Sequence, residues 1–499
     1  MFNYIPAERR RNLHLYKYSG VDQSLVSRYI LNPYWNWLVT LFPKTVAPNT
    51  ITLSGLLLVG INFITLLLHD GALQCGVDSK LDPTSSLFNN TDLKQLISAG
   101  QALPVTPFLP RHGLPERIQS TSIVPGWNLL SLFSSATSGD SAPLNGSTCL
   151  PHWVYYTWAL CLFLYQSLDS IDGKQARRTG MAGPLGELFD HGCDAINTTL
   201  ECILISSALN LGRSYWTLAS IIATLSNFYL TTWEEFHTGT LFLSAFSGPV
   251  EGILMIVAVY AVTAYAGGPT FWDQGVLNVT GLSKIGIVQQ FLSKWNFPLS
   301  EAFLLFGAVG LAFNVVASYS NVLAAIAKKR QAAGKSAASA STGSSLKPLL
   351  GLLPLLVQVA GNTVWVTAQK QQIMVDGHAF IPFLSYWGIA FAYNVGLLIV
   401  AHVTKAPFPY WNAAAVWSVI GAIDASLPSP LLQSTPGRVR ATIYVSLLAA
   451  LFLYGHFCYH VITTITKEIG VPCFVVRPKR AVEEETKGTA AVVQNKKSS

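Results

Sequence analysis

The stretch DSIDGKQARRTGMAGPLGELFDHGCD, residues 169–194, concentrates charge between two long apolar segments. It contains five carboxylates, one histidine, one lysine and two arginines. Charged residues make up only 11% of the 499-residue chain and hydrophobic residues 51%, whereas soluble domains carry about 25% charged residues. The flanking segments are about 20 residues long, the length at which a helix crosses a hydrocarbon layer. The sequence therefore predicts an all-α, polytopic membrane protein.

Apolar segments of similar length recur on both sides of this stretch, so we expect about ten transmembrane helices. Their approximate boundaries are 50–69, 152–171, 185–209, 214–234, 249–267, 297–320, 348–368, 379–402, 410–426 and 439–465. Residues 50–465 then form one transmembrane domain, which includes a long loop at 70–151 and a linker at 325–347. Residues 1–49 form an N-terminal segment and residues 466–499 a tail.

The N-terminal segment starts polar and lacks an early apolar core, so it does not resemble a cleavable signal peptide. Within it, NPYWNWLVTLFPK (32–44) mixes aromatic residues with a lysine. This composition is typical of a helix lying in the headgroup zone of a membrane. A short soluble helix packed against the body of the protein is the alternative interpretation.

Positive residues indicate the orientation in the membrane. Arg9, Arg10, Arg11 and Lys17 precede the first span, and KKRQAAGKSAASASTGSSLK (328–347) joins the sixth and seventh. With an even number of spans, both segments and the C-terminal tail lie on one side. The tendency of positive loops to remain inside makes that side cytosolic.

Features of the opposite side agree with this orientation. The glycosylation sequons at Asn89 and Asn145 fall in the 70–151 loop, and that at Asn278 falls in the 268–296 loop. Cys75 and Cys149 lie in the first of these loops and could pair there. The chain ends KKSS, which resembles a cytosolic dilysine address for the endoplasmic reticulum; a solvated basic tail is the alternative interpretation.

The spacing within 169–194 predicts two acidic stripes that face each other. Asp169, Asp172, Gly173 and Ala176 follow i, i+3, i+4, i+7 on one helix. The segment 179–184 contains Gly180, Gly183 and Pro184, which break the helix and start another. The second helix presents its own polar stripe with the same spacing: Glu187, Asp190, His191 and Asp194.

Four converging aspartates at membrane depth would repel one another and cost about 2.5–3.5 kcal/mol each. A pair of hard divalent cations, Mg²⁺ or Mn²⁺, would neutralise them, because these ions prefer carboxylate oxygen and bridge phosphates. Gly173, Ala176 and Gly186 leave room for a bulky ligand near the backbone. Three cationic side chains offer charge for phosphate oxygens: Lys174, Arg177 and Arg178. Together these features suit a phosphoanhydride substrate.

The pattern Asp169-x2-Asp172-Gly173-x2-Ala176-Arg177-x8-Gly186-x3-Asp190-x3-Asp194 resembles the signature of the CDP-alcohol phosphotransferase family. The segments DGKQARRT, PLGELFDHG, LFPKTVAPNTITLSG (41–55) and WEEFHTGT (233–240) are similar to its eukaryotic choline/ethanolaminephosphotransferase branch. The resemblance covers most of the chain outside the 70–151 loop, the linker and the tail. The 70–151 loop is longer than the family leads us to expect.

The resemblance implies an enzyme that transfers phosphocholine or phosphoethanolamine from CDP-choline or CDP-ethanolamine to diacylglycerol, releasing CMP. It implies two Mg²⁺ or Mn²⁺ ions held by the four aspartates, and a CDP site lined by Gly173, Ala176, Arg177, Gly186 and Asn49. The family further suggests a homodimer. From the KKSS ending and the positive segments, we expect it in the endoplasmic reticulum membrane or the Golgi membrane, with the active site facing the cytosol. Membrane lipids are expected partners and nucleic acids are not.

His191 is the expected catalytic base, because the resemblance implies this role and a histidine can accept a hydroxyl proton near neutral pH. Glu187 lies one helical turn earlier and could orient it. In the alternative interpretation, His191 only lines the pocket or bonds to Asp194. Near the same mouth, four residues of WEEFHTGT could receive a cationic headgroup: Trp233, Glu234, Glu235 and His237. A solvated helix end would explain them as well.

Other functions fit the residues less well. A transporter could use intramembrane carboxylates, but no internal repeat is evident. A prenyltransferase would need a second, separate aspartate-rich cluster. A catalytically silent scaffold would not need the full set of aspartates. The sequence does not separate choline from ethanolamine as the preferred headgroup, and we favour choline only slightly.

Overall fold

The computed structural model describes residues 4–22, 24–75, 150–243, 248–287, 296–332 and 347–476. The sequons at Asn89 and Asn145, the cysteine Cys149, most of the 325–347 linker and the end of the tail lie outside these residues. Cys75 is bonded in a disulfide, as expected for the loop that follows the first span, although its predicted partner is not among the described residues.

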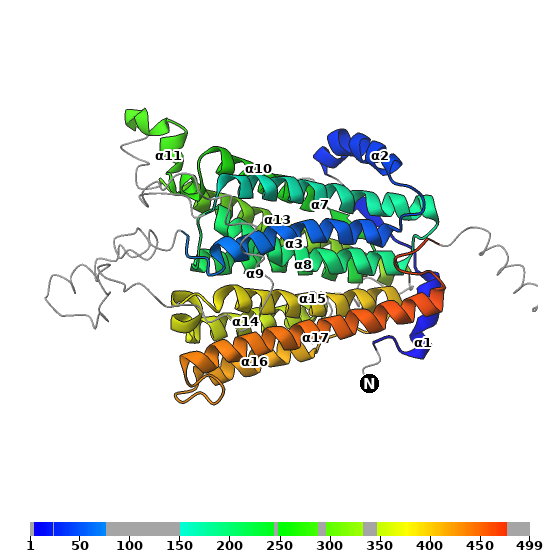
Figure 1. Cartoon of the computed structure of the whole chain (residues 1–499). Helices are drawn as coiled ribbons and strands as arrows, with labels where there is room; N and C mark the ends of the chain where they lie inside the picture. The colour runs from blue at the N-terminus through cyan, green and yellow to red at the C-terminus, as the bar shows by residue number, and fades with distance from the viewer. Residues whose placement is uncertain are drawn as a thin grey trace, which may run out of the picture. The chain divides into compact units, whose positions relative to one another are not determined.

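A helix occupies each of the predicted spans, and Figure 1 shows the long helices running alongside one another. In chain order they are α3 (Pro48–Asp70), α7 (His152–Thr179), α8 (Pro184–Ala208), α9 (Tyr215–Thr238), α10 (Pro249–Tyr265), α13 (Leu299–Ala332), α14 (Leu353–Ala368), α15 (Phe380–Thr404), α16 (Ala413–Ser426) and α17 (Pro436–Ile469). The shorter helices are α1 (Ala7–Arg10), η1 (Arg11–Leu15), η2 (Ser27–Leu31), α2 (Asn32–Leu41), η4 (Pro269–Asp273), α11 (Val276–Val279), η5 (Leu282–Lys284), η8 (Lys347–Leu352) and η9 (Gln371–Val375).

Within the described ranges, five helical segments are long and apolar enough to cross a membrane: α3, Leu299–Lys329 in α13, Lys347–Ala368, α15 and α17. The helices α7, α8 and α9 have sufficient length but carry the charged residues of the site. The apolar helices α10 and α16 are shorter, with 17 and 14 residues. A polytopic membrane protein is therefore supported, and the count of about ten spans remains a prediction.

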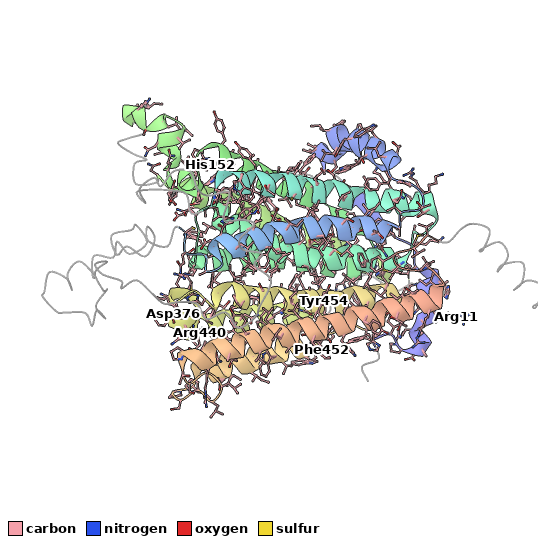
Figure 2. The ribbon with its side chains drawn as sticks, viewed as in Figure 1. Arg11, His152, Asp376, Arg440, Phe452 and Tyr454 are labelled. Carbon is pink, nitrogen blue, oxygen red and sulfur yellow. The ribbon has the colours of Figure 1, made fainter. Side chains whose placement is uncertain are left out.

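The positions of labelled side chains agree with a membrane belt across the helices. Figure 2 places Arg11 at one end of the helices, and His152, Asp376 and Arg440 at the other. Phe452 lies between the two ends on α17 and is 76% exposed. Large exposed apolar side chains at mid-length and charges at the ends are what a bilayer favours.

The predicted break between the second and third spans is confirmed. α7 ends at Gly180, whose φ of 74° is a left-handed conformation that glycine adopts without strain. The amide of Met181 also donates to the carbonyl of Ala176 at 2.9 Å. α8 begins with Pro184 in its first turn. The acidic residues of the two helices are therefore brought together by a short turn.

The N-terminal segment lies across the ends of the helices that carry the site. Arg9 Nη1 donates to the carbonyl of Lys405 at 2.6 Å, and Asn12 Nδ2 to that of Thr404 at 2.7 Å, both at the end of α15. The segment then forms strand β1 (Gly20–Asp22), which pairs in parallel with β2 (Leu241–Leu243) after α9. This short pair is an exception to the all-α prediction within the described residues.

A helix is present at the expected interfacial position, since α2 lies beside α7 (Figure 1). Whether it lies in a headgroup layer stays a prediction. Lys174 Nζ donates to Asn36 Oδ1 at 2.8 Å, and Arg178 Nη1 donates to the carbonyls of Val39 and Phe42. Two cations near the end of α7 therefore hold α2 against it.

Candidate functional site

The two acidic stripes converge. Asp169 on α7 and Asp190 and Asp194 on α8 each offer a carboxylate oxygen, and these atoms lie within 4.8 Å of one another. Asp169 Oδ1 and Asp190 Oδ1 are buried and have no hydrogen-bond partner among the described residues. Buried carboxylate oxygens without donors are costly. The cluster is therefore suited to bind a cation.

Neighbouring hydroxyl groups orient two of the aspartates. Thr52 on α3 donates from Oγ1 to Asp172 Oδ2 at 2.5 Å. The hydroxyl of Tyr165 on α7 donates to Asp194 Oδ1. Sequence reasoning missed both, although Thr52 lies within the family-like segment 41–55 and Tyr165 lies one turn before Asp169 on the same helix.

The donor set fits a hard divalent cation. Asp169, Asp190 and Asp194 offer only carboxylate oxygens, which Mg²⁺ and Mn²⁺ prefer over nitrogen or sulfur. Asp172 lies one turn after Asp169 on α7, but it is not part of the group within 4.8 Å. Cys193, the nearest thiol in sequence, is buried and free.

His191 lies between the acidic residues of α8 and is only 8% exposed. Its Nδ1 is 3.0 Å from the carbonyl oxygen of Glu187. Because a carbonyl can only accept a hydrogen bond, this contact favours the tautomer with the proton on Nδ1. The lone pair then lies on Nε2. The alternative bond from His191 to Asp194 is not among the hydrogen bonds of the described residues.

The small residues leave space near the turn between the two helices, and Arg177 is exposed beside it. A Cβ added to Gly186 would meet no atom within 4 Å, and one added to Gly173 would lie 3.7 Å from Arg177 Nη1. Ala176 is buried. Arg177 is exposed, and its guanidinium has no hydrogen bond to any residue that the structure describes. It is available for an anionic ligand, whereas Lys174 and Arg178 are engaged by α2.

Asn49, expected near the nucleotide, is buried at the start of α3. Its Nδ2 donates to the carbonyl oxygen of Cys473 at 3.1 Å and lies 3.3 Å from the sulfur. Phe474 packs edge-on against Phe189 of α8, with ring centroids 5.5 Å apart. The segment after α17 therefore returns over the starts of α3 and α8, and Asn49 holds it there.

The four residues expected near the headgroup point in different directions. Trp233 Nε1 donates to the carbonyl of Pro348 at 3.0 Å. Glu234 Oε1 accepts from Asn321 Nδ2 on α13 at 2.7 Å. His237 lies parallel to the ring of Phe408, with centroids 6.3 Å apart. None of these three contacts involves a residue of the acidic stripes.

Glu235 alone of the four joins the site. Glu187, Glu235 and His402 form a second group in which one ligand atom from each lies within 4.8 Å of the others. They come from α8, α9 and α15. Sequence reasoning missed His402, because it lies near the end of an apolar span without any recognisable motif around it.

Tyr18 lies beside both groups. Although its side chain is 56% exposed, burial of the hydroxyl and the negative charges of Glu235, Asp190 and Asp172 raise the pKa of Tyr18 to about 12. The phenol therefore stays protonated at neutral pH and can donate a hydrogen bond. The N-terminal segment thus brings the phenol of Tyr18 to the site, a contact that the sequence did not predict.

Comparisons with known proteins agree with the resemblance. The family profile described as CDP-alcohol phosphatidyltransferase matches residues 146–287. An uncharacterized CDP-alcohol phosphatidyltransferase class-I family protein of Schizosaccharomyces pombe is 35% identical over 94% of this chain and 96% of its own length. Choline/ethanolaminephosphotransferase 1 of Saccharomyces cerevisiae is 32% identical over 82% of this chain and 81% of its own. Cholinephosphotransferase 1 of the same yeast is 28% identical over 96% and 99%.

Proposed function

Because this chain belongs to the CDP-alcohol phosphatidyltransferase family, we propose that it transfers phosphocholine or phosphoethanolamine from a CDP-alcohol to diacylglycerol. The products are phosphatidylcholine or phosphatidylethanolamine and CMP, as in the last step of the CDP-choline and CDP-ethanolamine routes. The observation that carries this proposal is the group of Asp169, Asp190 and Asp194 beside a buried histidine. The relatives named choline/ethanolaminephosphotransferase support the substrate class.

Asp169, Asp172, Asp190 and Asp194 are the residues that would hold two Mg²⁺ ions, with Mn²⁺ as a substitute. The unpartnered oxygens of Asp169 and Asp190 support this assignment. When bound, Mg²⁺ supplies positive charge that offsets the negative charge building on the transferred phosphoryl group and on CMP. Thr52 and Tyr165 fix the orientation of Asp172 and Asp194 through their hydroxyl groups.

His191 acts as the general base in this proposal. Its Nε2 accepts the proton of the diacylglycerol hydroxyl, which is a poor nucleophile until the proton leaves. The carbonyl of Glu187 holds the Nδ1 proton and stabilises the imidazolium that forms. Arg177 binds phosphate oxygens of the nucleotide, and bidentate contacts from its exposed guanidinium suit that role. Gly173, Ala176 and Gly186 allow the nucleotide to approach the two helices.

We further propose that the site opens toward the cytosol in the membrane of the endoplasmic reticulum or Golgi, and that the protein is a homodimer. Arg11 lies at the end of α17 where that helix finishes, which supports a common side for the positive N-terminal residues and the tail (Figure 2). A cytosolic opening suits the water-soluble nucleotide, while diacylglycerol enters from the bilayer.

The test is transfer by purified protein in detergent micelles containing diacylglycerol and Mg²⁺. Radiolabelled CDP-choline and CDP-ethanolamine are offered separately and then in competition. We expect labelled phospholipid from at least one of them, and none from Asp190→Asn. A wild-type protein that binds CMP but makes neither phospholipid would overturn the proposal and favour a silent scaffold.

A further inference from the structure

We propose that Glu187, Glu235 and His402 form a subsite for the positively charged nitrogen of the alcohol headgroup. The three residues come from α8, α9 and α15, and one ligand atom from each lies within 4.8 Å of the others. This inference rests on the proposed function, because it assumes that a CDP-alcohol occupies the aspartate site.

The charge balance of this group calls for a cation. Glu187 is 7% exposed and Glu235 3%, and neither oxygen of Glu187 has a hydrogen-bond partner among the described residues. Among the described residues, no lysine or arginine forms an ion pair with either glutamate, and the titratable side chains that face them are two histidines, His191 and His402. Burying two carboxylates without a full positive charge beside them is costly. A ligand that brings positive charge would remove this cost.

The position along α8 matches the length of a headgroup. Glu187, Asp190, His191 and Asp194 lie on one face of the helix, so Glu187 of the second group lies one turn from both Asp190 and His191. The phosphorus under attack must lie near His191 and the aspartates. In choline and ethanolamine, two carbons join the phosphate oxygen to the nitrogen. In the proposed subsite, this short link spans the one helical turn of α8 that separates Glu187 from Asp190 and His191.

The surroundings favour an organic ammonium over a metal ion. The ring of Tyr16 meets the ring of His402 edge-on, with centroids 6.2 Å apart. Tyr18 lies near Glu235. Aromatic rings combined with carboxylates are typical of sites for ammonium groups. Both tyrosines belong to the N-terminal segment, which is fixed to α15 and β2.

The experiment compares CDP-choline with CDP-3,3-dimethylbutanol, in which carbon replaces the nitrogen and the charge disappears at nearly constant size. For the wild type, we expect kcat/KM to favour CDP-choline by at least about tenfold, as for a buried charge contact. In Glu235→Gln this preference should fall toward one, while inhibition by CMP, which has no headgroup, stays unchanged.

Glu234→Gln is the matched control. Glu234 is the adjacent residue and is equally buried at 3%, but it bonds to Asn321 on α13. We expect it to keep the wild-type preference for the charged headgroup. Glu187→Gln should reproduce the loss seen in Glu235→Gln, and it replaces that variant if the latter no longer binds CMP.

Each outcome has a distinct meaning. If Glu187→Gln and Glu235→Gln prefer CDP-choline as strongly as the wild type does, the subsite is wrong while the transferase activity stands. The subsite is also wrong if Glu235→Gln changes the response to Zn²⁺ or Mg²⁺ but not the headgroup preference, since the group would then bind a metal. A wild type that transfers neither headgroup would instead refute the proposed function.

Discussion

The hydroxyl of Thr52 offers the most direct test of the metal-binding site, because it contacts an aspartate of the site and is not itself one of the proposed carboxylate ligands. Thr52→Val removes the donor that lies 2.5 Å from Asp172 Oδ2 and keeps the shape of the side chain. The side chain is only 1% exposed, so water cannot easily replace the lost hydroxyl. The Asp172 carboxylate would then lose the hydrogen bond that fixes its orientation.

The size of the effect follows from this hydrogen bond. Hydrogen bonds to charged groups contribute about 1.5–3 kcal/mol, and about 1.4 kcal/mol corresponds to a factor of ten in an equilibrium constant. Residues that orient metal ligands typically change metal affinity by about 10–100-fold. We therefore expect the Mg²⁺ concentration for half-maximal transfer to rise by about 10–100-fold in Thr52→Val.

The assay is phosphocholine transfer at saturating substrates over a Mg²⁺ titration. Thr52→Ser keeps the hydroxyl and should remain near the wild type. Ser54→Ala serves as a control on the same helix, because its exposed hydroxyl bonds only to the carbonyl of Thr50 among the described residues. An unchanged Mg²⁺ dependence in Thr52→Val would show that Asp172 is not a metal ligand held by this contact.

Three further predictions concern the base, α2 and the topology. His191→Gln should lower kcat by about 10²–10⁴-fold and leave CMP affinity unchanged; loss of CMP binding instead would make His191 a nucleotide contact. Arg178→Ala should lower the thermal unfolding midpoint, because each lost hydrogen bond to α2 contributes about 1 kcal/mol, whereas the exposed Arg177→Ala should not; equal midpoints would contradict the anchoring role. Asn278 is exposed in α11, so Asn278→Cys should react with an impermeant maleimide only from the lumenal side, and labelling from the cytosol would reverse the topology.

The local parts of this protein could be predicted from the order of its residues. The helix pair around Gly180 and Pro184 could be predicted because helix-breaking residues act on their own neighbours. The convergence of Asp169 with Asp190 and Asp194 could be predicted because helical periodicity fixes which residues share a face. The long apolar segments likewise marked the helices, since the bilayer requires backbone hydrogen bonds to be satisfied within each segment.

The distant side chains that meet at that helix pair are known from the packing of the helices, and no sequence pattern predicted them. His402 joins Glu187 and Glu235 through the packing of α15 against α8 and α9, and no spacing rule relates residues so far apart in the chain. The same packing decided that Glu235 faces the site while Glu234 faces α13, and that Lys174 and Arg178 hold α2. The sequence gives the chemical type of each side chain, but its contact partner depends on how the helices pack together.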